Sequence, residues 1–242
     1  MRRSFTPALA VSALALALAA TPAGAQKVEP PNPHKFIGSE SVEPHFSGEA
    51  EEFALKPFTI SCEEAKSTAS GVTPTFPSKT LTAVVKYSDC EAEATLNKAE
   101  YELKAKFLTP VTLNYHANGA VEVGAGGTVK EGKLEGAGAI EIAVSGPFKC
   151  VIDIAPGTYP AKSLKKPEAE YEAAKFANQE ETVVKGKGSV VVKKLAISTA
   201  LTKMPYELEG EFCEALPKTE YTGGAYTGSL LAELKKGDIG WE

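Results

Sequence analysis

The sequence predicts an all-β, antiparallel, sandwich-like protein that is exported and stapled by disulfides. Three observations lead to this prediction: segments in which apolar and charged residues alternate, four cysteines near the ends of such segments, and an N-terminal apolar run. Alternation predicts strands because successive side chains of a strand point to opposite faces of the sheet. Many short segments of this kind, separated by turn residues, are typical of sandwiches.

Residues 1–25 are expected to be a signal peptide. Arg2 and Arg3 supply positive charge, and residues 8–20 form an apolar run that is broken only by Ser12. Residues 23–25 read Ala-Gly-Ala, a small-residue cleavage site. The run is shorter than the about 18 residues of a membrane span. We therefore expect no integral membrane anchor, and a location that is secreted, extracellular or in the cell envelope.

Residues 26–45 are expected to be a Pro-rich disordered linker. This stretch contains Pro30, Pro31, Pro33 and Pro44 among few apolar residues. Such a composition buries too little apolar surface to offset the conformational entropy lost on ordering. The linker would be either a spacer from an envelope anchor or a plain leader.

A single β-rich domain is expected over residues 46–234, followed by a C-terminal tail at 235–242. Asn118-Gly119 is a strong hairpin signal between two of the expected strands. The segment 168–177 stays open, because its composition favours a helix while its order also suits a strand. The expected strands lie within 53–62, 80–87, 91–107, 111–115, 121–123, 140–144, 148–154, 190–201, 206–212 and 219–234.

The chain also suggests two similar halves. The pattern Tyr-Glu-Leu, followed by Phe four residues later, occurs at residues 101–107 and again at 206–212. This pattern is common in strand-rich chains, so one sandwich and two duplicated units both remain open.

Four cysteines in an exported chain most often form two disulfides. Three pairings are possible, and the order along the chain favours Cys62 with Cys90 and Cys150 with Cys213, since each pair then brackets one half. A metal site of four thiolates is disfavoured, because no Cys-x-x-Cys spacing occurs and the expected compartment is oxidising.

Several spacings resemble an uncharacterised family of secreted actinobacterial proteins with paired cysteines. The matching residues are Phe58, Cys62, Tyr87, Cys90, Asn97, Tyr101, Cys150, Ile152, Ile154, Cys213 and Tyr226-Thr227-Gly228. The similarity covers about Phe53 to Leu234. Members of the family carry an extra cysteine where this chain has Ala99 or Glu100, and a second extra cysteine is also absent here. The resemblance implies a β-rich fold and export, and it implies no activity.

Charge argues against nucleic acid as a partner. Loss of the signal peptide would lower Lys+Arg from 26 to 24, so against 31 Asp+Glu the formal charge would change from −5 to −7. Nucleic-acid binding requires a concentrated basic patch. A partner therefore remains unknown, with contact to the envelope or to a polysaccharide as one possibility.

The sequence contains no recognisable catalytic constellation, and we expect no cofactor and no metal. No Gly-x-Ser-x-Gly occurs, and His116 is the one histidine expected inside the fold, since His34 and His45 fall in or near the linker. Residues 127–133 imitate a phosphate loop, but Leu134 stands where Ser or Thr should hold magnesium. Calcium is disfavoured because no Asp-rich ligand loop occurs.

The sequence therefore favours a non-enzymatic β-sandwich protein with a structural or binding role. The alternative is a secreted glycoside hydrolase that uses a pair of glutamates. Most glutamates alternate with apolar residues and are expected to face solvent, so the sequence nominates no pair. Tyr221, Tyr226 and Trp241 are the candidates for aromatic contact with a sugar, and packing in the core or in a hairpin is the favoured alternative for the two tyrosines.

Overall fold

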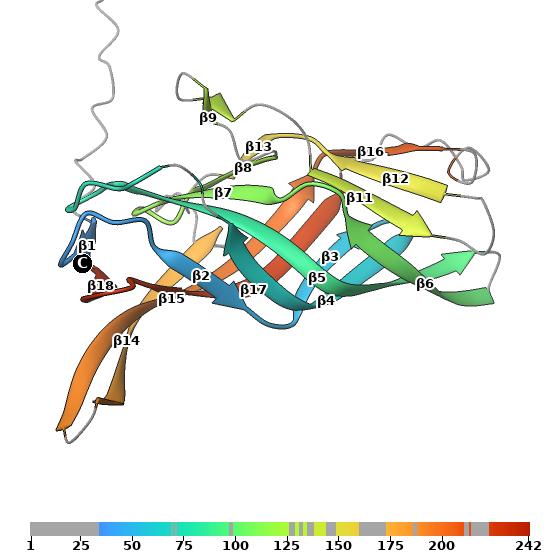
Figure 1. Cartoon of the computed structure of the whole chain (residues 1–242). Helices are drawn as coiled ribbons and strands as arrows, with labels where there is room; N and C mark the ends of the chain where they lie inside the picture. Colours follow the sequence, from blue (N-terminus) through green and yellow to red (C-terminus); the bar gives the residue numbers. More distant parts are fainter. Residues whose placement is uncertain are drawn as a thin grey trace, which may run out of the picture. The chain divides into compact units, whose positions relative to one another are not determined.

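The computed structural model describes residues 34–68, 70, 72–96, 99–125, 129–130, 133–134, 138–143, 149–159, 173–185, 188–210, 213 and 223–242. The expected signal peptide and the first part of the expected linker lie outside these residues. Within them the chain is almost entirely antiparallel strand, which confirms the predicted fold class (Figure 1). No helix in these ranges is long and apolar enough to cross a membrane.

Most strands belong to one large branched sheet. The strands are β1 (Phe36–Gly38), β2 (His45–Gly48), β3 (Glu51–Leu55), β4 (Phe58–Thr68), β5 (Thr80–Leu96), β6 (Ala99–Phe107), β7 (Val111–His116), β8 (Val121–Ala125), β9 (Val129–Lys130), β10 (Lys133–Leu134), β11 (Gly138–Ala143), β12 (Lys149–Ile154), β13 (Gly157–Tyr159), β14 (Ala174–Lys185), β15 (Gly188–Met204), β16 (Tyr206–Glu209), β17 (Gly224–Glu233) and β18 (Ile239–Trp241).

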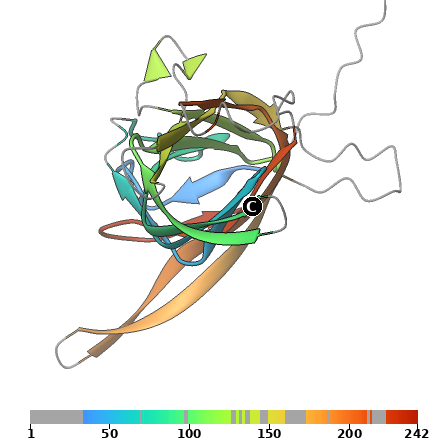
Figure 2. The same ribbon diagram turned by 90° about the vertical axis from the view of Figure 1, so that its right-hand side faces the viewer.

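The branch point is the long strand β5. The sheet runs β14-β15-β17-β2-β4-β5, with β3 between β17 and β4. The first half of β5 pairs with β7 and so leads to β8 and β13, whereas its second half pairs with β6 and leads to β11, β12 and β16. The sheet curls strongly (Figure 2), and residues from both branches pack into one apolar core. This packing of sheet faces against each other is what makes the fold sandwich-like.

The core follows from the alternating pattern. Ile140 and Ile142 of β11 and Ile152 of β12 are fully buried. The residues directly beside them in the same strands, which point to the other face, are more exposed. Asn118-Gly119 forms the turn between β7 and β8 as expected, with Gly119 in the left-handed region at a φ of 88°. Left-handed backbone is accessible to glycine without steric cost.

The expectation of a linker up to residue 45 and a tail from residue 235 is wrong for the described residues. Phe36 is completely buried, and β1 pairs with β18 so that Phe36 lies opposite Trp241. The backbone of Phe36 also exchanges two hydrogen bonds with Ser78. The high proline content suggested disorder, but the burial of Phe36 makes this segment part of the fold. Ile239 of β18 is buried in the same way.

The ambiguous segment near residue 170 becomes strand β14 from Ala174 onward, while residues 168–172 lie outside the described part. The strand expected at 190–201 is longer than predicted and only partly buried. Leu195 and Ile197 are fully buried, but Val190 and Val191 are about half exposed. The reason is that β15 pairs with β17 only from Leu195 onward, so its first residues run beyond the sheet.

The two similar segments are not equivalent in the structure. Tyr101 in β6 is 47% exposed, whereas Tyr206 in β16 is buried and donates a hydrogen bond to the carbonyl oxygen of Lys56. The structure therefore gives these two tyrosines different roles.

Candidate functional site

Three neighbouring strands change the phase of their inward-facing residues at the same level of the sheet. In β4 the buried residues Cys62 and Ala65 are three positions apart instead of two, and in β5 the same holds for Tyr87 and Cys90. Between β2 and β3 the phase also changes, across residues 48–50. The pairing register nevertheless stays continuous through this level. We call this line across the sheet the crease; it comprises residues 48–50, 63–64 and 88–89.

The backbone at the crease is strained. Ala50 has a φ of 56° and Asp89 a φ of 52°, both in the left-handed region. Aspartate tolerates this region better than alanine does, because its short side chain can bond to nearby backbone. Such residues cost on the order of 1–3 kcal/mol and persist only where the surroundings hold them. Each of these two residues allows its strand to reverse which face its side chains occupy.

A disulfide closes the sheet next to the crease. Cys62 of β4 and Cys90 of β5 lie directly opposite each other, with their Cα atoms 4.0 Å apart, and they are bonded. The second disulfide joins Cys150 of β12 to Cys213, which follows β16 in the chain. Both bonds have the pairing expected from the order of the cysteines.

A glutamate is buried on the inner side of the crease. Glu51, the first residue of β3, has no exposed surface. The Oη of Tyr226 donates a hydrogen bond to its Oε2 at 2.6 Å, and the backbone N–H of Ser229 donates to its Oε1 at 3.2 Å. The Oη of Tyr87 donates in turn to the Oη of Tyr226 at 3.2 Å. These contacts make a short chain of polar groups inside an otherwise apolar core.

Burial is the main cause of the altered pKa of the Glu51 carboxyl group. It raises the pKa of Glu51 from 4.5 to about 7, although the hydrogen bonds from Tyr226 and Ser229 lower the pKa in part. Burial also raises the pKa of Tyr87 and Tyr226 well above 10, so both phenols stay neutral. Removing a carboxylate from water disfavours its charged form, which is the physical cause of the rise for Glu51.

The carboxyl group of Glu51 fits into its site because two neighbouring residues are glycines. A Cβ at Gly228 would overlap Oε2 of Glu51, and a Cβ at Gly48 would come within 2.5 Å of Oε1. The ring of Phe53 packs against those of Tyr87 and Tyr226, at centroid distances of 5.0 and 4.7 Å. The carboxyl group is therefore enclosed by backbone on one side and by aromatic rings on the other.

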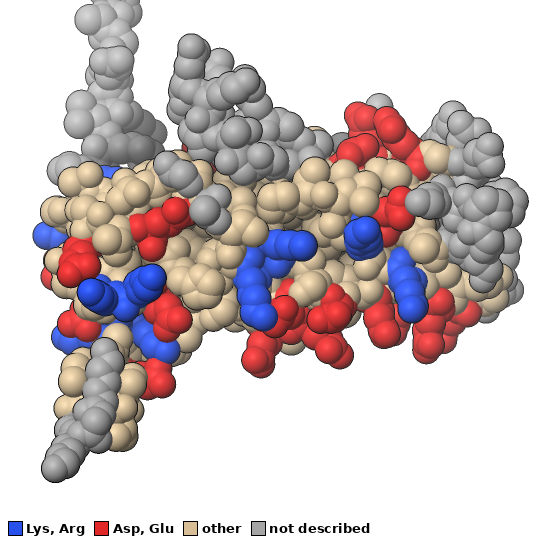
Figure 3. Space-filling view, in the orientation of Figure 1, with Lys and Arg blue, Asp and Glu red and all other residues tan. Residues whose placement is uncertain are grey.

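The outer side of the crease carries two open grooves. One has a volume of about 980 Å³ and the other about 620 Å³. Both are lined by Glu49, Glu63 and Asp89 of the crease. The larger groove is also lined by Lys104 and Lys106 of β6, so it presents both signs of charge. Acidic and basic side chains are interspersed over the visible face of the molecule (Figure 3).

Of the aromatic residues proposed for sugar contact, the two that the structure describes make contacts within the protein. Tyr226 is buried and bonded to Glu51, and Tyr221 lies outside the described residues. Trp241 stacks on His34 with ring centroids 4.6 Å apart, and its Nε1 donates to the carbonyl oxygen of Ala117. Tyr226 shares its phase with Leu230, which could have marked its burial in the sequence.

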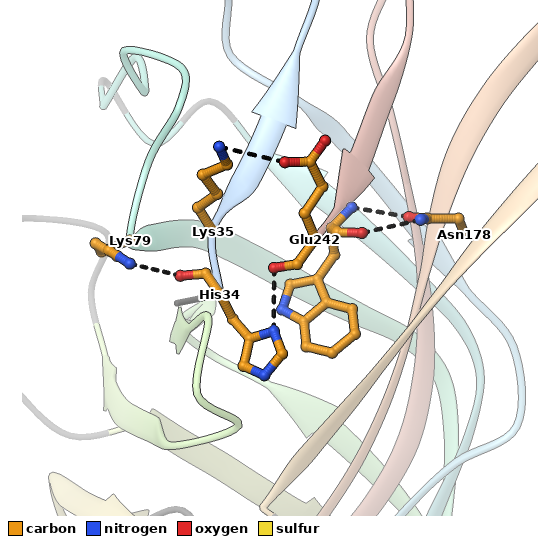
Figure 4. Close-up of polar contacts among 6 residues, drawn as sticks. His34, Lys35, Lys79, Asn178 and Glu242 are labelled. Carbon is orange, nitrogen blue, oxygen red and sulfur yellow. Dashed lines mark hydrogen bonds and ion pairs between the residues drawn. The ribbon is translucent and has the colours of Figure 1, made fainter. Parts of the chain in front are cut away.

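The three histidines take part in local structure. The Nε2 of His116 lies 3.2 Å from Oε1 of Glu122 on the neighbouring strand β8, and His45 is within 3.0 Å of Oγ of Ser67. His34 belongs to a cluster that joins the two ends of the described chain (Figure 4). Of the segment that imitates a phosphate loop, Gly127 and Gly132 lie outside the described residues, and Lys133 lies in β10.

This end cluster was missed by reasoning from the sequence. The side chain of Asn178 in β14 makes two hydrogen bonds to the backbone of Trp241, and Lys35 forms an ion pair with Glu242 at 3.3 Å (Figure 4). Lys79 donates to the carbonyl oxygen of His34. The cluster fixes β1 and β18 against the base of β14. Within the described ranges, no group of three or more acidic, histidine or cysteine residues is placed to hold a metal ion.

Comparison with known proteins identifies no family for this chain. No protein-family model matches the chain, and no curated protein matches it. One solved structure is similar over 85% of this chain and 88% of its own, namely acetoacetate decarboxylase from Legionella pneumophila subsp. pneumophila. The identity is 10% and the TM-score is 0.17. A likeness this remote identifies neither a fold relationship nor an activity.

Proposed function

We propose that this protein is a non-enzymatic, secreted or cell-envelope β-sandwich protein with a binding role, and that the grooves over the crease contact an envelope polysaccharide. Its two disulfides support an oxidising location outside the cytoplasm. The two grooves are open and are lined by charged side chains together with apolar surface, and the charged groups can bond the hydroxyl groups of an extended sugar chain.

The observation that carries this proposal is the position of Glu51. A glycoside hydrolase needs two carboxyl groups that flank the scissile bond, about 5–9.5 Å apart, with one of them kept protonated by its surroundings. Glu51 is the one acidic residue that is buried among the described residues. It has the raised pKa of a general acid, but its oxygens are occupied by Tyr226 and Ser229, and it lines neither groove.

The larger groove offers hydrogen-bonding groups of both charges. Carboxylates of Glu49, Glu63 and Asp89 can accept hydrogen bonds from sugar hydroxyl or amino groups, while Lys104 and Lys106 can donate to acidic groups on the same polymer. Binding through many solvent-exposed polar contacts is expected to be weak for each sugar and to grow with the length of the chain.

The test is co-sedimentation of the purified protein with insoluble cell-wall polysaccharide. The variant Glu63→Gln/Asp89→Asn removes two charges from the shared edge of both grooves, and asparagine tolerates the backbone at residue 89. We expect this variant to bind at least tenfold more weakly. The control Glu207→Gln/Glu209→Gln removes the same charge from exposed positions of β16, outside both grooves, and should bind like the wild type.

A hydrolase would give a different result. Release of reducing sugar from the polysaccharide, lost in the variant Glu51→Gln, would overturn the proposal and establish the alternative. Equal binding by wild type and by Glu63→Gln/Asp89→Asn would show that the grooves over the crease are not the contact surface.

A further inference from the structure

The outer part of the β14–β15 hairpin extends beyond the rest of the sheet (Figures 1 and 2). We call residues 180–185 and 188–193 the distal hairpin. Here β14 pairs with β15, and β15 has not yet begun its pairing with β17, which starts at Leu195. The last described contacts to neighbouring elements are those of Lys193 with Asp238 and of Lys194 with Glu233.

Both faces of the distal hairpin carry valines beside polar and charged residues. Directly paired residues share a face, so Val184 and Val191 lie on one side, and Val183, Val190 and Val192 lie on the other. Val184 is 77% exposed, Val191 53% and Val190 49%. Strands with apolar residues on both faces are typical of sheets that are covered on both sides. The described neighbours of this hairpin provide no such cover.

Its outer edge is also open. Strand β14 ends the order of the large sheet, so its outer backbone groups have no described strand beside them. Its pairing with β15 is regular over 12 residues, without a bulge and without proline. Natural edge strands are often short, bulged or interrupted by proline, or they carry charged residues. Of these features β14 has only the charged residues, at positions 175, 180, 181 and 185. A free two-stranded ribbon is at best marginally stable in water, and additional strands stabilise it.

These features favour a partner that adds a strand over a lipid surface. In hydrocarbon the unpaired N–H and C=O groups of β14 would stay without hydrogen bonds, which costs several kcal/mol for each group. A protein strand satisfies those groups and adds apolar neighbours on both faces at the same time.

We propose that the partner is a second copy of this chain, with β14 paired antiparallel to β14 of the other copy about a two-fold axis at Val183. This register places Val183 opposite its own counterpart and Thr182 opposite Val184. It also places Glu181 opposite position 185, where the sequence has lysine. An axis at position 180 or 181 would set a glutamate against itself, and like charges directly opposite each other are destabilising. An axis at Thr182 would set Glu181 opposite Val183 and Glu180 opposite Val184. The axis at Val183 instead pairs opposite charges and joins the valines, and this favours that register.

Cross-linking tests the register. The variant Val183→Cys places two thiols at the two-fold axis, so oxidation should link most of the protein into dimers on a non-reducing gel. The control Lys175→Cys puts the same new thiol on the same face of β14, eight positions away from the axis, and should remain monomeric. Equal cross-linking of both variants, or none in either, would overturn the proposal.

Sedimentation equilibrium tests the association without a new thiol. The wild-type mass should rise with concentration toward twice the monomer value, and Val183→Glu should shift the dissociation constant upward at least tenfold while the melting temperature of the monomer is kept. A wild type that stays monomeric at every concentration, including one that instead floats with phospholipid vesicles, would overturn the proposal. Because neither readout involves polysaccharide, its failure is distinguishable from failure of the function proposed above.

Discussion

The crease and the distal hairpin use the same kind of strand in opposite ways. At the crease, left-handed residues at positions 50 and 89 and a buried carboxyl group are held in place by three paired strands and a disulfide. In the distal hairpin the pairing is regular, but apolar side chains stay in water and one edge is open. The comparison teaches that local strain is tolerated where the surrounding sheet is complete, and that regular geometry alone does not bury a strand.

The largest expected effects are those of losing either disulfide, beginning with the one beside the crease. Replacing Cys62 and Cys90 by alanine should lower the free energy of unfolding by about 3.5 kcal/mol, because the loop that the bond closes spans 28 residues. Denaturant titration under oxidising conditions measures this loss. The pair Cys150→Ala/Cys213→Ala is the reference, with an expected loss of about 4 kcal/mol for its 63-residue span.

The two losses should differ in one respect. Glu51 lies opposite Cys62 in the ladder, so removing that bond should admit water to the carboxyl group and weaken the pH dependence described below. Removing the bond between Cys150 and Cys213 should leave the pH dependence unchanged. If both variants showed the same pH dependence, the crease disulfide would not be what keeps water away from Glu51.

The next largest effect is expected for Gly228→Ala. The added methyl group would overlap Oε2 of Glu51, which is fixed by its hydrogen bond from Tyr226, so the free energy of unfolding should fall by about 3 kcal/mol. The matched control is Gly223→Ala in the same region, where a Cβ meets no atom within 4 Å and the change should stay within about 0.5 kcal/mol. Thermal or denaturant unfolding of both variants measures the difference.

A double variant sharpens this test. In a protein that already carries Glu51→Ala, the carboxyl group no longer blocks a Cβ at residue 228, and Oη of Tyr226 remains 2.5 Å from that position. Gly228→Ala should then cost at least 1 kcal/mol less than it does alone. Additive losses would mean that the methyl group is resisted by Tyr226 and not by the carboxyl group.

The pH dependence of stability should be opposite to that of an ordinary carboxylate. The folded protein raises the pKa of Glu51 from 4.5 to about 7, so between these values the folded state binds more protons than the unfolded state. The contribution of Glu51 to the free energy of unfolding is therefore fully present below pH 4.5 and decreases as the pH rises to about 7. The total decrease is on the order of 2–3 kcal/mol.

Glu51→Gln should remove this dependence. Its amide does not titrate, so the free energy of unfolding of the variant should vary less between pH 5 and pH 7.5 than that of the wild type. Denaturant titrations across this range provide the measurement. A variant that keeps the full slope would assign the pH dependence to another group.

The smallest expected effect belongs to the distal hairpin. Val184→Thr and Val191→Thr replace exposed side chains with polar ones of similar shape, so the free energy of unfolding of the monomer should change by less than about 0.5 kcal/mol. Unfolding at low protein concentration measures this. A loss above 1 kcal/mol from either variant would show that these valines already pack within the monomer, and the contrast with the crease would disappear.

Much of the fold could be predicted from the sequence, because alternation fixes both the existence of a strand and its inner face. The strands with Ile140 and Ile152, the hairpin at Asn118-Gly119 and the cysteine pairs follow directly from local pattern and chain order. The continuous length of β5 does not, because its phase change at residues 88–89 looks like the end of one strand and the start of another.

The burial of the Glu51 carboxyl group could be predicted in part from the sequence. Glu51 lies in phase with Phe53 and Leu55, both buried, so the alternation itself placed this glutamate on the inner face. It was grouped with the solvent-facing glutamates because its partners, Tyr226 and Ser229, lie more than 170 residues away. A contact of this range depends on the order of strands in the sheet, which local pattern does not determine.

Exposure of the distal hairpin could not be predicted for the complementary reason. Three consecutive valines from Val190 to Val192 predict burial, and burial requires a neighbour on each side. The valine pattern indicates that these residues would be stabilised by burial. Whether they are buried depends on the position at which β17 begins to pair with β15.

The pairing of β1 with β18 has a mechanical consequence. Lys35 and Glu242 exchange two backbone hydrogen bonds, so these two residues lie side by side at one end of this short ladder. Figure 4 shows the ion pair between their side chains. A load applied through both positions would open this ladder one rung after another, as a zipper opens, before any force reached the core strands. Under tension the molecule would thus lengthen first by yielding two three-residue strands, while its disulfide-bonded interior stayed folded.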